Sequence, residues 1–561
     1  MFVRVKTTPN SPRKSVQIVQ SVRKGAKISQ KIIRHVGIAM DDEELKHLKM
    51  LAETIRVKLE ADNQQLLFSP EEIAKIHIEA KKEKEKNKEI AESYNVNLQD
   101  LEEEQRIING IHDVYGKLFD DLGCKKILKD PSRNKASVEI FKNIVMARIA
   151  NPQSKRATVN FLEENYGVTL NLDQVYKMMD KLDNEAINRL NEIMYTETAK
   201  LYGGKIDVVF FDCTTVYFES FNEDEFRKNG YSKDLKFNQP QVLIALMVTK
   251  EGLPIGYKAF SGDTYEGHTL IPALKELKEK YKLDKVVYVA DAGMFNKNNI
   301  MELEALENTG FKYIVGARLK NMTKELQQQI LDLSNYKEIV AGIKIATFDY
   351  KDRKLIVSYS EKRARKDAYD RNKAIEKLKE KLGKQKNPKS YLSNYGYRKY
   401  LQVEGESSFS LNEEKIYADS LWDGLHGVIT NAEKLSNQEI LNQYKNLWQI
   451  EEAFRITKHD LKVRPIFHWK PNRVKAHLAI AFTGYALVKH LAYRVKLQYK
   501  SLSPEKIRQH LVNTQTIILY DKKKKVRFAF PSKINLESEK IYNIMNVRKS
   551  NKPWIIKKCS A

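Results

Sequence analysis

Residues 207–220 read DVVFFDCTTVYFES, a run of large apolar side chains that leads directly into the carboxylate of Asp212. A continuous apolar run of this length predicts a strand that is buried on both faces of a sheet. An ionised side chain at the end of such a strand is costly unless a partner compensates its charge. The stretch KVVYVADAGMF at residues 285–295 repeats the pattern, with Asp291 directly after the apolar run.

The elements around these two runs predict an α/β fold. Strand patterns at 206–211, 242–249 and 254–260 precede a helical pattern at 268–283, a strand at 285–290, a helix at 297–308 and a strand at 313–318. A three-strand meander followed by alternating helices and parallel strands is the order of the ribonuclease H-like fold. The fold class expected is therefore a ribonuclease H-like catalytic core, interrupted by a β-rich insertion and preceded by a mainly helical DNA-binding region.

The two aspartates are expected to lie together at one edge of this sheet. Either Asp212 or Asp291 alone is equally compatible with an ordinary turn after a strand, so the pair is the stronger indication. Their strands are neighbours in the ribonuclease H-like order, and ligands bind at the carboxyl ends of such strands. Two close carboxylates repel each other unless a proton or a cation lies between them, and oxygen ligands suit Mg²⁺ or Mn²⁺.

A helix further along the chain provides a third carboxylate. Ser436 and Glu439 form a capping-box pattern, which predicts a helix from about residue 437 to about residue 461. Within that range Tyr444, Glu451 and a lysine at 458 are each seven residues apart, so a regular helix would place them on one face. The neighbouring Glu452 points elsewhere and is predicted to be an ordinary surface residue.

The pattern of charge and apolarity also predicts the domain organisation. The predicted segments are an N-terminal β-hairpin with a helical or linker region (1–105), a helical DNA-binding region (106–203), the first part of the core (204–335), a β-rich insertion with a basic helix (336–431), the second part of the core (432–515) and a basic C-terminal tail (516–561). The basic helix is expected at 361–389, which holds twelve basic and five acidic residues.

The net charge indicates a polyanionic partner. The chain has 98 lysines and arginines against 73 aspartates and glutamates, a net charge of +25. Residues 1–40 hold nine basic residues and no acidic one, and residues 461–500 do the same. Acid-free basic stretches are typical of contact with nucleic acid phosphates. Neither a signal peptide nor a membrane span is recognisable, and the three cysteines form no metal or redox pair, so a reducing cytoplasm is expected.

Here the sequence resembles a known family. Asp212, Asp291 and Glu451, in this order, resemble the catalytic residues of DDE transposases of bacterial insertion sequences. The stretch YKNLWQIEEAFRITK at 444–458 resembles the Tyr-x2-Arg-x3-Glu-x6-Lys signature of the subgroup with a β-rich insertion before the catalytic glutamate. The stretches FFDCTTVYF, YVADAGMF, GYSKD, PQVLIALMV and VRPIFHW add to a resemblance that covers roughly residues 107–500.

The resemblance implies metal-dependent cleavage and strand transfer of DNA. Two metal ions, Mg²⁺ with Mn²⁺ as a possible substitute, would be held by Asp212, Asp291 and Glu451, with Asp212 bridging them. The residues expected to contact DNA are Tyr444, Lys458, Arg455, Arg464 and Lys462. The implied partners are double-stranded DNA, both the inverted repeats at the element ends and the target, and a second copy of the chain in a synaptic homodimer. The implied location is the bacterial cytoplasm, at the nucleoid and not at a membrane.

One position departs from the signature, because Leu447 stands where the subgroup has arginine. Either Arg455, one turn beyond Glu451, takes over the phosphate contact, or the contact is absent and the enzyme works poorly. The first hypothesis is preferred, because the tyrosine, glutamate and lysine of the signature remain in register. Two other functions stay open: a ribonuclease H-like nuclease that does not join strands, and a catalytically silent DNA-binding derivative of a transposase.

Overall fold

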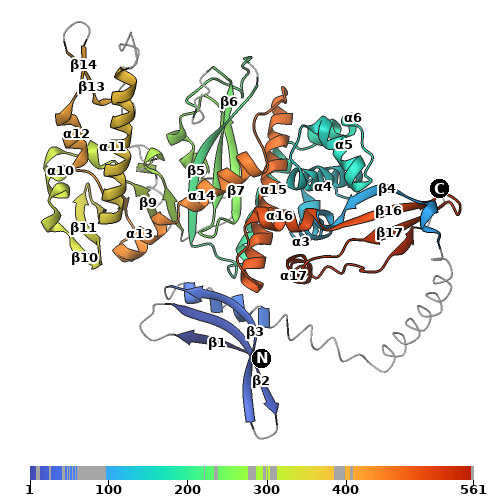
Figure 1. The fold of residues 1–561 in the computed structure, drawn as a ribbon. Coiled ribbons are helices and arrows are strands. Elements are labelled where there is room, and N and C mark those ends of the chain that lie inside the picture. The colour runs from blue at the N-terminus through green and yellow to red at the C-terminus, as the bar shows by residue number, and fades with distance from the viewer. Residues whose placement is uncertain are drawn as a thin grey trace.

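The fold is taken from a computed structural model (Figure 1). It describes residues 1–7, 13–24, 27–40, 44–46, 48–49, 51–53, 55–56, 59, 96–219, 221–232, 238–273, 275, 286–294, 299, 301–302, 312–383, 399–404 and 408–556. Residues 60–95 of the predicted helical or linker region, residues 276–283 of one predicted helix and most of the helix predicted at 297–308 lie outside these residues.

A nine-stranded mixed sheet forms the centre of an α/β fold. From edge to edge its strands are β10 (Lys337–Val340), β11 (Ile343–Tyr350), β12 (Arg353–Ser360), β15 (Leu425–Thr430), β9 (Lys312–Gly316), β8 (Val287–Ala290), β5 (Val208–Tyr217), β6 (Gln241–Val248) and β7 (Pro254–Ser261). Strands β5, β6 and β7 form an antiparallel meander, and β8 and β9 run parallel to β5. All five strands predicted from the apolar runs are therefore present.

Strand β5 is buried on both faces, because the sheet separates two hydrophobic cores. Phe210 and Val216 pack into one core, whereas Val209 and Phe211 pack into the other. This alternation follows from the two-residue period of a strand. Asp212 has the same parity as Phe210, so it lies on the face of the sheet that helices α14 (Trp448–Arg455) and α15 (Pro471–Gln498) cover.

Most strands of the predicted insertion continue the main sheet, and two of its strands form a separate hairpin. Val428, Ile429 and Thr430 of β15 pair with β9, and β12, β11 and β10 follow beyond β15. The remaining elements of this region are α10 (Lys324–Leu331), the long helix α11 (Glu361–Gly383), the hairpin β13 (Leu401–Glu404) and β14 (Ser408–Leu411), and α12 (Glu413–Ser420). In Figure 1 these elements lie together at one end of the molecule.

Helix α15 lies between the sheet and a group of helices from the first half of the chain (Figure 1). That group comprises α3 (Gly116–Asp121), α4 (Lys135–Ala150), α5 (Lys155–Tyr166), α6 (Leu172–Asp180) and α7 (Asn184–Lys200). A helix that is buried around its whole circumference, as α15 is from Ala476 to Leu491, is expected at such a central position. No helix in the described part of the chain combines the length and apolarity needed to cross a membrane.

The C-terminal segment is folded, which corrects the prediction of a basic tail. Helix α16 (Pro504–Val512) leads into β16 (Gln515–Asp521), β17 (Val526–Pro531), α17 (Leu536–Ile544) and β18 (Trp554–Ile556). Strand β16 also pairs with β4 (Leu101–Ile108), a stretch predicted to be helix or linker. The pairing joins segments about 400 residues apart, and Phe528, Ile541 and Tyr542 are buried by the resulting structure.

The first strands form a small sheet of their own. Strands β1 (Phe2–Thr7), β2 (Lys14–Lys24) and β3 (Lys27–Ala39) are antiparallel neighbours, in agreement with the alternating pattern of the sequence. This sheet contacts the end of α15, where Arg34 donates a hydrogen bond to the Gln498 side chain at 3.1 Å.

Candidate active site

Asp212 and Asp291 lie side by side on neighbouring parallel strands. The register pairs Phe211 of β5 with Ala290 of β8, so the next residue of each strand is an aspartate. Adjacent strands lie about 4.8 Å apart. Strand β5 continues past Asp212 to Tyr217 because β6 still pairs with it there, so Asp212 lies inside the strand, just beyond the last residue that pairs with β8.

Backbone amides hold one oxygen of each aspartate. Asp212 Oδ1 accepts a hydrogen bond from the Cys213 N–H, and Asp291 Oδ1 accepts one from the Ala292 N–H, both at 2.7 Å. These bonds orient the two carboxylates toward the same cavity, of about 460 Å³, which Glu451 also lines. We call it the carboxylate cavity.

The helix that carries Glu451 begins as predicted but is not continuous. The Ser436–Glu439 capping box is formed, and α13 runs from Asn437 to Lys445. A tight turn at Asn446 and Leu447 then separates it from α14. The helix ends in a π-helical turn, η11 (Ile456–Asp460). The turn coincides with the burial of the Leu447 side chain, which is only 9% exposed and belongs to the hydrophobic core.

The structure brings two of the three signature residues of this helix together. Tyr444 and Glu451 both line the carboxylate cavity. Lys458, in the π-helical turn, instead lines a small apolar cavity of about 30 Å³ beside Thr214 and Leu246. The irregular helix therefore does not present Tyr444, Glu451 and Lys458 to one common space.

Tyr444 contacts an aspartate directly. Its hydroxyl donates a hydrogen bond to Asp291 Oδ1 at 3.2 Å. Burial and the negative charge of Asp291 raise the pKa of Tyr444 above its ordinary value, so the hydroxyl remains a donor at neutral pH. Gly316 of β9 leaves room for this contact, since a Cβ there would lie 2.4 Å from the Tyr444 hydroxyl.

Two further residues of the cavity were not recognised in the sequence. His426 of β15 stacks against the Tyr444 ring at 5.0 Å, and burial together with the charge of Arg363 lowers the pKa of His426 to about 4. Arg363, in the first turn of α11, lines the same cavity. For Arg363, the only indication in the sequence was the basic composition of 361–389. For His426 there was no indication, because none of its neighbours in sequence is a predicted site residue.

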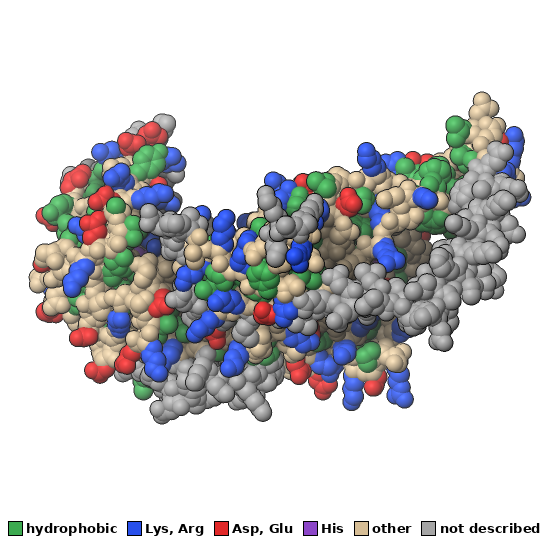
Figure 2. All heavy atoms as spheres, turned by 90° about the horizontal axis from the view of Figure 1, so that it is seen from below, with side chains coloured by type: hydrophobic (Ala, Val, Ile, Leu, Met, Phe, Trp, Pro, Cys, Tyr) green, Lys and Arg blue, Asp and Glu red, His purple; other side chains and the backbone are tan. Residues whose placement is uncertain are grey.

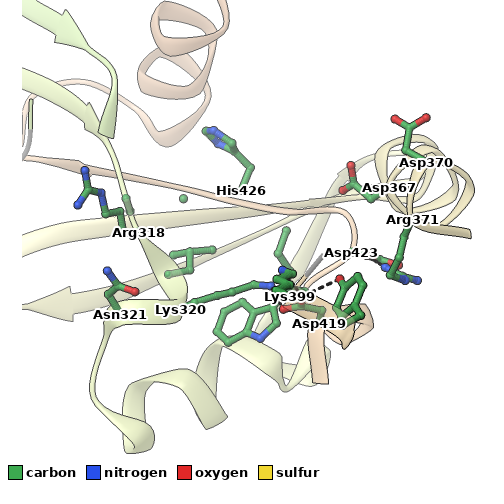
Figure 3. Close-up of a pocket in the computed structure, with 16 residues that line it drawn as sticks. Arg318, Lys320, Asn321, Asp367, Asp370, Arg371, Lys399, Asp419, Asp423 and His426 are labelled. Carbon is green, nitrogen blue, oxygen red and sulfur yellow. Dashed lines mark hydrogen bonds and ion pairs between the residues drawn. The ribbon is translucent and has the colours of Figure 1, made fainter. Parts of the chain in front are cut away.

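A larger cavity of about 840 Å³ adjoins the carboxylate cavity at His426 (Figure 3). Several of its charged side chains are paired with one another. Asp419 forms ion pairs with Lys320 and Lys399 and accepts a hydrogen bond from the Tyr400 hydroxyl, and these contacts hold its pKa well below the ordinary value despite partial burial. Satisfied charges of this kind connect α12 with Lys320 and Lys399 and indicate a structural role.

Arg455 does not line the carboxylate cavity. Its guanidinium donates hydrogen bonds to both Asp460 carboxylate oxygens, at 3.1 and 3.2 Å. It lines a second cavity of about 460 Å³ together with Glu452 and Lys489, which we call the lysine cavity. The structure therefore does not bring Arg455 to Asp212, Asp291 and Glu451, where the preferred hypothesis needs it.

Glu452 is not an ordinary surface residue, in contrast to the prediction. Its carboxylate accepts a hydrogen bond from Lys489 Nζ at 2.9 Å, and the side chains of Glu452 and Lys489 are only 26% and 10% exposed. The prediction failed because Lys489 is on α15 and reaches Glu452 only through the tertiary packing.

The loop after the helix that carries Glu451 holds two predicted DNA contacts, Lys462 and Arg464. Buried Arg148 of α4 donates hydrogen bonds to the carbonyl oxygens of Leu461 and Lys462, at 3.2 and 3.1 Å. Arg464 lies over the ring of Tyr217, at the end of β5, at 6.0 Å. Arg464 is therefore near the end of β5, and neither Lys462 nor Arg464 lines the carboxylate cavity.

The acid-free stretch 461–500 is not acid-free in space. Arg473 forms a bidentate pair with Asp180 at 2.7 Å, Lys500 pairs with Glu537 at 3.0 Å, and Lys489 pairs with Glu452. On the face shown in Figure 2, lysine and arginine side chains are spread along the length of the molecule and do not form one patch. Charge patterning along the sequence thus overstated the local excess of positive charge in this segment.

The carboxylate oxygens of Asp212 and Asp291 suit a divalent cation. Glu451, the predicted third ligand, does not lie close enough to the two aspartates to form a site with them. Carboxylate oxygens are the ligands that Mg²⁺ and Mn²⁺ prefer. Across the described residues, no group of three or more His, Cys, Asp or Glu side chains lies close enough to hold a metal ion. Glu451, which is exposed, lines the cavity without completing the site.

Comparison with known proteins agrees with this geometry. Residues 203–487, just over half of the 561 residues, match the family described as Transposase DDE domain. The chain therefore belongs to this family of transposases, whose active members cut DNA during transposition, generally with a divalent metal, and which also includes inactive derivatives. The resemblance seen in the sequence is confirmed at this level, and DNA is the implied partner; the Tyr-Arg-Glu-Lys subgroup stays a prediction. No curated protein matches the chain.

Proposed function

We propose that the chain is the transposase of an insertion sequence, which cuts DNA at the element ends and joins those ends to a target. The observation that carries this proposal is the register of β5 and β8, which sets Asp212 beside Asp291 in a cavity that Glu451 also lines. Family membership supports DNA cleavage. The meander of β5 to β7 followed by parallel β8 and β9 supports a ribonuclease H-like core.

Asp212 and Asp291 would hold Mg²⁺ or Mn²⁺, and Glu451 would complete the site after a change of rotamer toward them. Bound metal would activate the attacking oxygen, from water or a DNA 3′-hydroxyl, and stabilise the leaving oxygen. The backbone amides of Cys213 and Ala292 fix one oxygen of each aspartate. Tyr444 holds Asp291 through its hydroxyl, so it acts as a positioning residue.

The contacts with DNA are also part of the proposal. Lys458, Lys462 and Arg464 would contact the backbone near the sheet edge, and point charges of this kind carry no sequence information. The chain would act as a homodimer that holds two element ends, and it would belong to the subgroup with the Tyr-Arg-Glu-Lys signature despite Leu447. Apart from the tail at 516–561 and the boundary at residue 105, which β4 crosses, the predicted domain boundaries belong to the same proposal.

Assays of strand cleavage and strand transfer with DNA carrying the ends of the chain's own element test this function. Metal-dependent cleavage followed by joining of the cut end to a target is the expected result. Cleavage without joining would indicate a nuclease. DNA binding without cleavage in either Mg²⁺ or Mn²⁺ would indicate a silent derivative, the candidate that the buried Leu447 favours.

Recognition of the element ends is assigned to the first strands. Strand β4 pairs with β16 from Leu101 onward, so a deletion that tests this must spare it. Removal of residues 1–95 should abolish the preference for end sequences in a competition binding assay and leave the core folded. Preserved end preference would move recognition to the helical region at 106–203.

A further inference from the structure

The carboxylate cavity has three acidic residues and must still accept a phosphodiester if the proposed function holds. A DNA strand brings further negative charge close to Asp212, Asp291 and Glu451, so a cation other than the metal is expected to face it. Arg455 and Lys458 line other cavities. The lysine and arginine side chains that line the carboxylate cavity are Arg363 and Lys445.

Arg363 is fixed at a defined place by the start of α11. Strand β12 ends at Ser360, and Arg363 follows within the first helical turn. Its Nε lies 3.6 Å from Asp367 Oδ2, and that same carboxylate accepts a hydrogen bond from the Gly424 N–H at 3.1 Å. Because Asp367 is anchored to the strand side in this way, it orients the guanidinium.

Gly424 allows α11 to come this close. Its φ is +79°, a conformation that favours glycine, and a Cβ there would lie 2.8 Å from both Ala364 Cβ and the Ser360 carbonyl oxygen. The first turn of α11 is therefore packed directly against the loop that precedes β15.

The charge of Arg363 reaches the residues around Asp291. It contributes to the lowered pKa of His426 and works against the rise in the pKa of Tyr444, the two rings that lie beside that aspartate. At the same time the Arg363 side chain is 52% exposed, so its guanidinium retains donors that face solvent. An arginine whose guanidinium has one long contact with a carboxylate and further N–H groups facing solvent can bind two oxygens of a phosphate at once.

We propose that Arg363 binds the phosphate next to the scissile bond, so that the predicted insertion supplies the cation that helix α14 lacks at Leu447. This inference rests on the proposed function. Lys445 is the alternative cation of the cavity. It is the last residue of α13, where a lysine also compensates the helix dipole, and it has no fork with which to bind two phosphate oxygens.

The test combines Arg363→Ala with DNA in which one phosphate beside the cut is a neutral methylphosphonate. Arg363→Ala should lower the cleavage rate about 10- to 100-fold, the usual value of a charge-assisted hydrogen bond. The methylphosphonate should lower the wild-type rate similarly at one position. At that position it should have no further effect on Arg363→Ala, because the contact is already lost.

Lys362→Ala is the matched control: it removes an exposed cation of the same helix turn that does not line the cavity, and its cleavage rate should stay near that of the wild type.

The inference would be overturned if Arg363→Ala cleaved at the wild-type rate. It would also be overturned if, at every position tested, the methylphosphonate slowed Arg363→Ala by the same factor as it slows the wild type. Loss of the methylphosphonate effect in Lys445→Ala but not in Arg363→Ala would transfer the role to Lys445. Absence of cleavage by the wild-type protein would instead contradict the proposed function. Arg363→Lys, which keeps the charge and loses the fork, replaces the alanine variant if that variant does not fold.

Discussion

Two cavities of equal volume, about 460 Å³ each, border helix α14, share Trp448 in their lining and receive neighbouring glutamates. Glu451 lines the carboxylate cavity with Asp212 and Asp291. Glu452 lines the lysine cavity and is paired with Lys489 at 2.9 Å. The two residues are adjacent in sequence and identical in type, so their different roles come only from what the fold places opposite each.

The difference shows how structural and functional acids can be distinguished. In the lysine cavity Glu452 has a cation of the protein, Lys489, as its partner. In the carboxylate cavity Asp212, Asp291 and Glu451 share one space with the cations Arg363 and Lys445, and a metal ion from outside the chain would lower the repulsion between the carboxylates further. Neutralising an acid should therefore lower the free energy of unfolding when the acid lies in the lysine cavity. It should lower the rate of DNA cleavage when the acid lies in the carboxylate cavity.

The largest effect is expected for Asp212→Asn and Asp291→Asn. Each should lower the cleavage of element-end DNA by about a thousandfold or more, because metal stabilisation of the transition state is worth several kcal/mol. The unfolding temperature should be unchanged or slightly raised, since the substitution removes repulsion between the carboxylates. Single-turnover cleavage and thermal unfolding measure the two quantities.

Asp349→Asn serves as the control, because Asp349 is exposed on β11 of the same sheet and lines neither cavity. Its cleavage rate should equal that of the wild type. Cleavage near the wild-type rate in Asp212→Asn or Asp291→Asn would remove that aspartate from the site.

Next in size is the contrast between Glu451→Gln and Glu452→Gln. The first should abolish cleavage with no loss of stability. The second should lower the free energy of unfolding by about 1–2 kcal/mol, because Lys489 keeps its charge in a mostly buried position without a carboxylate partner. Urea unfolding and cleavage kinetics should therefore give opposite orders for the two variants. The same order in both measurements would break the distinction between the cavities.

A smaller effect is expected for Leu447→Arg in the Arg363→Ala background. An arginine at 447 lines the carboxylate cavity and can replace the lost phosphate contact, so cleavage should recover about tenfold. Thermal unfolding must accompany the rate, because Leu447 is 9% exposed and a charge there disturbs the core. A folded double variant without any recovery would contradict the phosphate contact.

The smallest effect is expected for Arg455→Ala. Its ion pair with Asp460 is exposed and contributes no more than about 1 kcal/mol, so cleavage should stay within about twofold of the wild type. A tenfold loss would place Arg455 at the DNA and restore the hypothesis drawn from the signature.

Local patterns in the sequence predicted the part of the site that depends on local structure. The apolar runs before Asp212 and Asp291 gave β5 and β8, and the Ser436–Glu439 pair gave the start of α13. Burial of both strand faces and helix capping are determined by a few adjacent residues, so the signal lies in the sequence itself.

The remainder depends on contacts between distant segments. The partner of Glu452 is on α15, the pairing of β4 with β16 joins the two ends of the chain, and Arg363 reaches the cavity only because β12 and β15 extend the main sheet. The turn at Leu447 likewise follows from burial of that side chain, which helical periodicity alone does not reveal. Such long-range pairings leave no pattern in neighbouring residues.

Metal-dependent cleavage by Asp212→Cys and Asp291→Cys tests most directly whether the two aspartates hold the catalytic metal. A thiolate is a softer ligand than a carboxylate and binds Mn²⁺ better than Mg²⁺. Both variants should be inactive in Mg²⁺ and should recover part of the cleavage of element-end DNA in Mn²⁺. Equal, near wild-type cleavage in Mg²⁺ by either variant would show that this carboxylate does not bind the metal.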